Sequence, residues 1–254
     1  MTQTSDTSRP AAPRVWRGKR PFASPGMIRT LAGAVLAVGV VASIWGVAYD
    51  INGATQAQAF VVVDVHAHPG AVLQVSGTTA AGVPATVLVK DGAEPTTPFN
   101  LTIPGVPAST ETSSATLDGH GATLTLRSWG STVPEQLFSR GGLAVVGLCM
   151  GVGAIWLRRV LISVAEGRPF EPGNATRIAG IGGLLALASL ANDIIPVFGS
   201  HLVLQRLGLD GPASPVFASV FPSPGPLLIV PFLLVLAEAF RRGAELTREV
   251  EGLV

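Results

Sequence analysis

The sequence is poor in cysteine and in charge. Among its 254 residues, Cys149 is the only cysteine, so one chain cannot form an internal disulfide or a thiolate metal cluster. Charged residues make up 13% of the chain, whereas a soluble domain has roughly a quarter. The mean hydropathy of +0.48 is correspondingly high. Together these values exclude an ordinary soluble protein.

Recognisable catalytic motifs are also missing from the sequence. It contains no nucleophile paired with a base, no glycine-rich phosphate loop and no paired catalytic carboxylates. We therefore expect a protein that is not an enzyme and has no cofactor. We also expect no direct contact with nucleic acid, because the basic residues lie at the edges of apolar stretches.

Four apolar stretches, 31–48, 143–157, 178–198 and 227–237, are nearly free of charge, and each has an arginine cluster on one side only. With the N-terminus in the cytoplasm, most basic residues fall inside and few outside, as the positive-inside rule requires. The inner set is Arg9, Arg14, Arg17, Lys19, Arg20, Arg29, Arg158, Arg159, Arg168, Arg177, Arg241, Arg242 and Arg248, and the outer set is Lys90, Arg127, Arg140 and Arg206. The chain is therefore predicted to cross the membrane four times.

Two of these spans allow another interpretation. The first could be a signal peptide cleaved after Ala59, but an export signal has an apolar region of about 7–15 residues and 31–48 is longer. We favour an uncleaved anchor. The fourth, 227–237, covers only about half of a 30 Å hydrocarbon core and needs its flanking residues and a bend at Pro231. A re-entrant or interfacial segment is the alternative there.

Small and polar residues inside the spans indicate helix contacts. Gly147 and Gly151 form a GxxxG motif, and the glycines from Gly180 to Gly183 could form a second small-residue face, although glycine is common in membrane helices. Asn192 and Asp193 form a polar pair near the outer end of their span. We expect them to cap or to hydrogen bond between helices rather than to conduct an ion.

The segment between the first two spans has a different pattern. Short β-branched runs at 60–65, 72–75, 86–89, 101–103 and 122–126 predict strands, with a hairpin through 118–121, a loop over 107–114 and a connector over 131–139. The predicted fold class is thus membrane α-helical, with four transmembrane helices and a small all-β extracytoplasmic domain between helices 1 and 2. The expected segments are a disordered basic leader over 1–26, transmembrane helices over 27–49, 141–165, 176–198 and 224–241, the exported domain over 50–140, a cytoplasmic loop over 166–175, an exported loop over 199–223 and a cytoplasmic helical tail over 242–254.

One strand carries the residue types of a metal site. Asp64, His66 and His68 alternate, so their side chains would leave one face of a strand, with His120 as a fourth candidate ligand. The string resembles the Asp-x-His-x-His of metal-dependent amidohydrolases, but that fold needs a barrel of about 200 residues and the exported segment is too short. We favour a solvated strand face and predict no metal.

The expected cytoplasmic parts carry the most specific motifs. A tight turn from Gly167 links two helices, with Asn174 as the predicted N-cap of the second, and the tail carries an apolar stripe that includes Phe240, Leu246 and Val250. We expect Phe170, Phe240, Leu246 and Val250 to form an interaction surface. The alternative is that Phe170 and Phe240 pack on each other and close the bundle.

These two passages resemble the bacterial membrane family catalogued as domain of unknown function 2975. The resemblance rests on Gly167, Pro169, Phe170 and Asn174 in the turn and on Phe240, Gly243 and Leu246 in the tail. It implies a four-span protein that is often encoded beside an Xre-type helix-turn-helix regulator. The large segment over 50–140 departs from the short members of that family.

From these observations we expect a multi-pass protein of a bacterial inner membrane, with both termini cytoplasmic and the bilayer as its surroundings. Its predicted role is that of a sensory or regulatory accessory that couples the exported domain to a cytoplasmic partner, either an Xre-type regulator or another membrane protein. A transport or metal-handling accessory and a structural envelope protein are the alternatives. Assembly as a homo-oligomer stays open.

The arginine asymmetry generates a prediction about topology. An alkaline phosphatase fused at Gly92 should be active, and one fused at Val254 should be inactive, because phosphatase folds only after export. Enzyme activity per unit of fusion protein is the measurement. An active fusion at Val254 or an inactive one at Gly92 would contradict the assignment.

Overall fold

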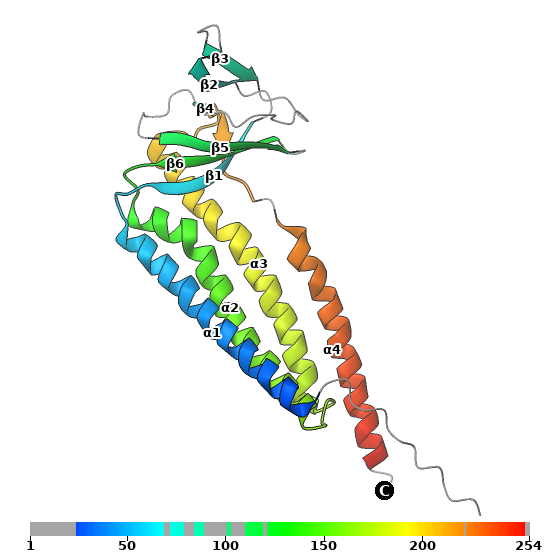
Figure 1. Cartoon of the computed structure of the whole chain (residues 1–254). Helices are drawn as coiled ribbons and strands as arrows, with labels where there is room; N and C mark the ends of the chain where they lie inside the picture. The colour runs from blue at the N-terminus through cyan, green and yellow to red at the C-terminus, as the bar shows by residue number, and fades with distance from the viewer. Residues whose placement is uncertain are drawn as a thin grey trace, which may run out of the picture.

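The computed structural model describes residues 24–68, 72–78, 84–88, 101–102, 110–118, 121–220 and 222–251, so the leader over 1–23 lies outside the described residues. Helices α1, α2 and α3 run side by side, and a sheet lies over one end of them (Figure 1). We call this end the sheet end and the opposite one the far end. In chain order the elements are α1 (Pro25–Thr55), β1 (Val61–Ala67), β2 (Val72–Thr78), β3 (Pro84–Leu88), β4 (Leu101–Thr102), β5 (Thr110–Asp118), β6 (Gly121–Ser128), α2 (Val133–Ala165), α3 (Pro172–Leu207), β7 (Val216–Phe217) and α4 (Pro224–Glu251).

Three helices, α1, α2 and α3, are long and apolar enough to cross a membrane. Even the shortest, α1 with 31 residues, would measure about 46 Å at helical rise, more than a hydrocarbon core of about 30 Å. These helices indicate a membrane-embedded protein. Helix α4 has 28 residues but is less apolar than these three helices. The structure therefore supports three of the four expected spans.

The helices extend beyond the predicted segments. Helix α2 begins at Val133, so the connector predicted over 131–139 is wrong from that residue onward. Thr132 forms a capping box with Glu135, which starts the helix earlier than its apolar run suggested. Helix α3 continues past Pro196 to Leu207, where the αL residue Gly208 ends it, and occupies the start of the loop predicted over 199–223.

Helices α1 and α2 pack through small residues. The buried positions of α1 are Ala32, Gly39, Gly46 and Gly53, which repeat every seven residues on one face. Opposite them, a Cβ added to Gly147 would lie 2.6 Å from the carbonyl oxygen of Ala42. Close backbone approach also lets the Ser43 hydroxyl donate to the Gly147 carbonyl oxygen at 2.8 Å. The GxxxG motif is therefore part of a real helix contact, since the side chain of Ser43 also fills the space beside Gly151.

Helix α3 touches both of its neighbours through glycines. At the sheet end, a Cβ on Gly142 of α2 would lie 3.1 Å from the Cα of Asn192. Further along α3, Gly180 faces the Trp156 ring of α2, and Gly182 faces Leu233 of α4. Helix α4 packs mainly on α3, and near the far end it also meets Val160 of α2 and Phe170 of the turn between α2 and α3. In Figure 1, α4 diverges from α3 towards the sheet end.

The sheet next to the helices has the strand order β5-β6-β1-β7, and β3-β2-β4 form a second sheet beyond it (Figure 1). The predicted hairpin is confirmed, because β5 and β6 pair antiparallel down to Asp118↔Gly121. Strand β5 begins at Thr110, so the loop predicted over 107–114 is wrong from there on. The edge strand β7 comes from the segment between α3 and α4 and pairs His66↔Phe217. The sheet is therefore not built only from the insertion between the first two helices.

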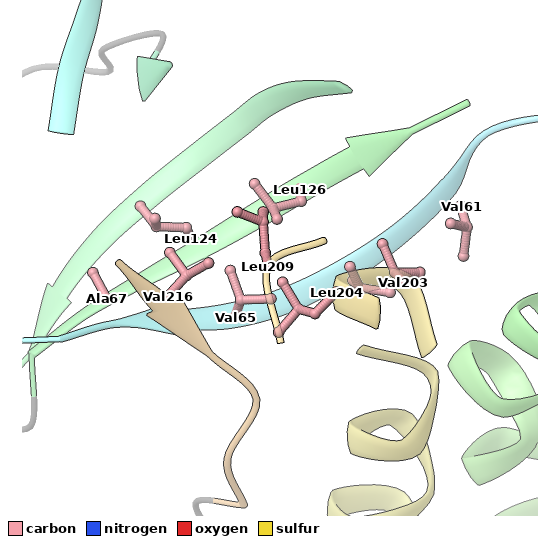
Figure 2. Close-up of a cluster of buried hydrophobic side chains, with 10 residues drawn as sticks. Val61, Val65, Ala67, Leu124, Leu126, Val203, Leu204, Leu209 and Val216 are labelled. Carbon is pink, nitrogen blue, oxygen red and sulfur yellow. The ribbon is translucent and has the colours of Figure 1, made fainter. Parts of the chain in front are cut away.

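The apolar face of this sheet forms the main core of the described residues. Alternate residues of β1 and β6 are buried, with Val65 of β1 and Leu124 of β6 fully so. They pack against Val203 and Leu204 at the end of α3 (Figure 2). Leu209 and Val216 close the cluster from the segment that follows α3. Because strand side chains alternate, the other face of β1 carries Val62, Asp64 and His66.

The glycine contacts generate a prediction. Gly46→Ala should lower the unfolding temperature of the detergent-solubilised protein, because its Cβ would lie 2.6 Å from the Leu143 carbonyl oxygen and backbone cannot move aside cheaply. We expect a loss of about 1–3 kcal/mol. The matched control is Gly33→Ala in the same helix, where nothing lies within 4 Å of the new atom. The control should be neutral or slightly stabilising, because alanine favours a helix. Equal effects at the two positions would refute the close-contact explanation.

Candidate functional site

A polar cleft lies between the sheet and the sheet end of the helices. Its volume is about 490 Å³, within the range of small-molecule sites. Its walls come from β1, β6, α2, α3 and the segment after α3. The residues that line it are Val62, Val63, Asp64, His66, Thr123, Ser139, Arg140, Gly142, Leu143, Asn192, Asp193, Pro196, Val197, Ser200 and Ser219. Two groups singled out in the sequence, Asp64/His66 and Asn192/Asp193, thus meet at one place.

The strand wall holds its polar groups by pairing across the sheet. Asp64 stands opposite Thr125, whose hydroxyl donates to Oδ1 of Asp64 at 2.7 Å. His66 stands opposite Thr123, with Nδ1 and Oγ1 3.1 Å apart. The ring of His66 also lies 5.9 Å from that of Phe217 in β7. Strand β1 therefore presents a fixed carboxylate and a fixed imidazole to the cleft.

The helix wall is held by contacts between segments. Asp193 accepts hydrogen bonds from the backbone N–H of Ser223 at 2.8 Å and from its hydroxyl at 3.5 Å, immediately before α4. This contact joins α3 to the residue that precedes α4, whereas the prediction was capping or a hydrogen bond between helices. Arg140 donates to Oε1 of Gln56 at 3.1 Å, and its guanidinium carbon lies 5.1 Å from the centroid of the Tyr49 ring. Arg140 thus ties α2 to the end of α1 beside the cleft.

The metal candidates do not converge. Asp64 and His66 share a face of β1, but His68 follows the strand, and its ring lies 4.5 Å from that of Phe217. His120 lies outside the described residues. Within the part of the chain that the structure describes, no three His, Cys, Asp or Glu side chains are grouped to hold a metal.

An ion pair between a buried carboxylate and a partly exposed guanidinium joins the sheet to both helices that support it. Glu135, at 2% exposure, accepts from Nε of Arg206 at 2.8 Å and from the N–H of Thr132 at 3.0 Å. The same guanidinium donates to the Ser128 hydroxyl at 3.0 Å and to the Trp129 carbonyl at 3.1 Å. The pair therefore links the first turn of α2, the last turn of α3 and the end of β6. We call it the sheet joint.

Two further hydrogen bonds reinforce the sheet joint. The fully buried Gln136 donates from Nε2 to the Phe60 carbonyl at 3.0 Å, just before β1. Ser200 of α3 donates to the Asp64 carbonyl at 2.9 Å. Strand β1 is thereby tied to α2 and α3 along the edge of the cleft.

At the far end, the two predicted motifs meet. The Phe170 and Phe240 ring centroids are 5.6 Å apart, and a Cβ on Gly243 would lie 2.6 Å from Cε1 of Phe170. Only glycine leaves room for the Phe170 ring at this place on α4. Leu246 and Val250, in contrast, are 62% and 63% exposed. Phe170 packs on Phe240 but is still 43% exposed, so of the four predicted interaction residues only Phe240 lies mostly inside the bundle.

A buried asparagine fixes the turn that carries Phe170. Gly167 takes a φ of 76° and ends α2, as predicted from its position. Asn174 is not the N-cap of α3, because the helix begins at Pro172 after Glu171. Its fully buried side chain instead donates to the Ser163 hydroxyl at 2.5 Å and to the Pro169 carbonyl at 3.0 Å. These hydrogen bonds of Asn174 fix the conformation of the turn that carries Phe170.

The sequence indicated the cleft residues of β1 and α3 but not the sheet joint. Glu135 and Arg206 are separated by most of α2 and α3, and neither belongs to a motif. The capping-box spacing from Thr132 to Glu135 was the one local signal. Comparisons with protein-family models, curated proteins and solved structures gave no match.

The sheet joint generates a stability prediction. Glu135→Gln keeps the side-chain shape but removes the carboxylate that Arg206 faces, so it should cost about 3 kcal/mol of unfolding free energy. Denaturant unfolding of the full-length protein in detergent is the measurement. The matched control is Asp210→Asn, which removes a carboxylate from the exposed contact with His201, 3.4 Å away. That variant should unfold like the wild type, and a Glu135→Gln protein of unchanged stability would contradict the role given to the joint.

Proposed function

We propose that this chain is a multi-pass inner-membrane protein of the sensory or regulatory type, which couples its exported sheet to a cytoplasmic partner. The sheet joint is the observation that carries the proposal, because it fastens the sheet to α2 and α3 together. Both helices run without interruption from the sheet to the far end (Figure 1). A displacement of the sheet would therefore move the turn around Phe170.

The far end offers the surface that such a movement would act on. The turn carries Phe170, which rests on Gly243 and Phe240 of α4. Beyond that contact, α4 continues as a charged helix on which Leu246 and Val250 remain exposed. In the proposed topology this tail is cytoplasmic. Exposed apolar residues on a helix that is otherwise polar are typical of a docking site for another protein.

We further propose that α4 is the fourth span. Towards the sheet end its exposed side chains are large and apolar, among them Leu228, Ile229, Phe232 and Val235. Contact with lipid would account for their exposure. The resemblance to the domain 2975 family points to an Xre-type helix-turn-helix protein as the partner. The turn and tail motifs that carry this resemblance are the segments that meet at Phe170.

The test is capture of such a regulator by the full-length protein in its native membrane. We expect chemical crosslinking and affinity purification, read by mass spectrometry, to recover a helix-turn-helix protein with the wild type. The double variant Leu246→Ser/Val250→Ser should accumulate normally, since exposed substitutions change stability by about 0.5 kcal/mol or less. It should nevertheless lose the regulator at least tenfold.

Two controls make this result specific. Glu249→Gln alters an exposed residue of the same helix and should retain the regulator. Phe170→Ala should reduce the amount of folded protein, because it empties the packing space over Gly243. If the double variant captures as much regulator as the wild type, the tail is not the docking surface.

A further inference from the structure

The cleft at the sheet end contains side chains of opposite charge and lies between the polar sheet and the apolar helices. Its strand wall contributes Asp64, and its helix wall contributes Arg140 and Asp193. Leu143 and Val197, which also line it, belong to helices apolar enough to cross a membrane. When these helices cross a bilayer, a cleft between their ends and a polar sheet would lie near the level of the lipid headgroups.

The charged groups differ in how many of their hydrogen bonds are already made. Asp193 is committed to Ser223 through both carboxylate oxygens. Asp64 accepts from Thr125 on Oδ1, and within the described residues nothing donates to its Oδ2. Arg140 gives one of its five N–H groups to Gln56, and its charge is also attracted by the nearby Asp50 carboxylate. The cleft therefore offers one carboxylate oxygen and several cationic N–H groups to a ligand.

We infer that the cleft binds a phosphoethanolamine group, with its ammonium on Asp64 and its phosphate on Arg140. A primary ammonium has three N–H donors and matches a carboxylate with a free oxygen, whereas a guanidinium binds phosphate oxygens in a bidentate manner. The Ser139 and Ser200 hydroxyls and the Asn192 amide add neutral polar groups to the same cleft. A volume of about 490 Å³ is sufficient for such a group.

The ammonium chemistry also predicts what the cleft rejects. A phosphocholine group has the same charges but no N–H on its nitrogen, so it cannot donate to Asp64. Discrimination between the two is therefore a direct test of the Asp64 contact. The inference deepens the proposed function, because it assigns a ligand class to the exported side. Its binding test does not involve the cytoplasmic tail, so either proposal can fail alone.

The experiment uses the full-length protein in nanodiscs that contain equal amounts of phosphatidylethanolamine, phosphatidylcholine and phosphatidylglycerol. After transfer to detergent, native mass spectrometry measures which lipids stay bound. The wild type should retain phosphatidylethanolamine about tenfold over phosphatidylcholine, the effect of one hydrogen bond to a charged group. Asp64→Asn should abolish this preference, whereas Arg140→Gln should lower the retention of both zwitterionic lipids, because they share the phosphate. The matched control Asp210→Asn, on the same side of the molecule but outside the cleft, should keep the preference.

A second arm separates a lipid headgroup from a free molecule of the same chemistry. Protein in phosphatidylglycerol nanodiscs is titrated with phosphoethanolamine or phosphocholine, and the unfolding temperature is recorded. If phosphoethanolamine raises the unfolding temperature, phosphocholine does not, and Asp64→Asn removes the effect, the cleft binds a soluble phosphoethanolamine compound. If the protein instead retains phosphatidylethanolamine, the ligand is the lipid headgroup. Equal retention of both zwitterionic lipids with no effect of free phosphoethanolamine would overturn the inference. So would an Asp64→Asn protein that is folded and binds like the wild type.

Discussion

The buried pair between Glu135 and Arg206 is the interaction on which the rest of the arrangement depends. A carboxylate at 2% exposure is stable only if its charge is compensated, and Arg206 supplies that charge from the last turn of another helix. The same guanidinium holds the end of β6 through Ser128 and Trp129. One side chain thus joins the two supporting helices to the sheet above them.

Away from the sheet, the helices are held together by close packing of small residues and not by charge. Lipid gives no hydrophobic drive for one apolar helix to leave it for another, so contact depends on close packing of small residues. Gly39, Gly46 and Gly53 give α1 a smooth face, and Gly147 of α2 lies against it. Helix α4 also packs through small residues near the far end, where Ala237 and Ala244 are buried and Gly243 lies against Phe170. Towards the sheet end, where α4 diverges from α3 in Figure 1, its side chains are large and exposed, among them Phe232 and Val235.

Local patterns in the sequence predicted local structure well. Alternation and the turn residues gave the β5–β6 hairpin and the strand that carries Asp64, and Gly167 marked the end of α2. Features that depend on distant residues were not predictable in the same way. Strand β7 has two residues and exists only because β1 offers an edge, and Arg206 resembled any other outer arginine until α3 placed it beside Glu135. The sequence singled out the polar residues of β1 and α3 that line the cleft, but it did not predict that they lie in the same cleft.

The pairing of β7 with β1 has a consequence for how the protein is made. Strand β1 leaves the ribosome soon after α1, yet its partner at Phe217 is synthesised only after α2 and α3. Until then the edge of β1 that carries His66 has unpaired backbone groups, which in an unfinished chain invite pairing with a wrong strand. Completion of the sheet must therefore wait for insertion of the third helix. Strand β7 can therefore cover the edge of β1 only in a chain whose α2 and α3 are already in place.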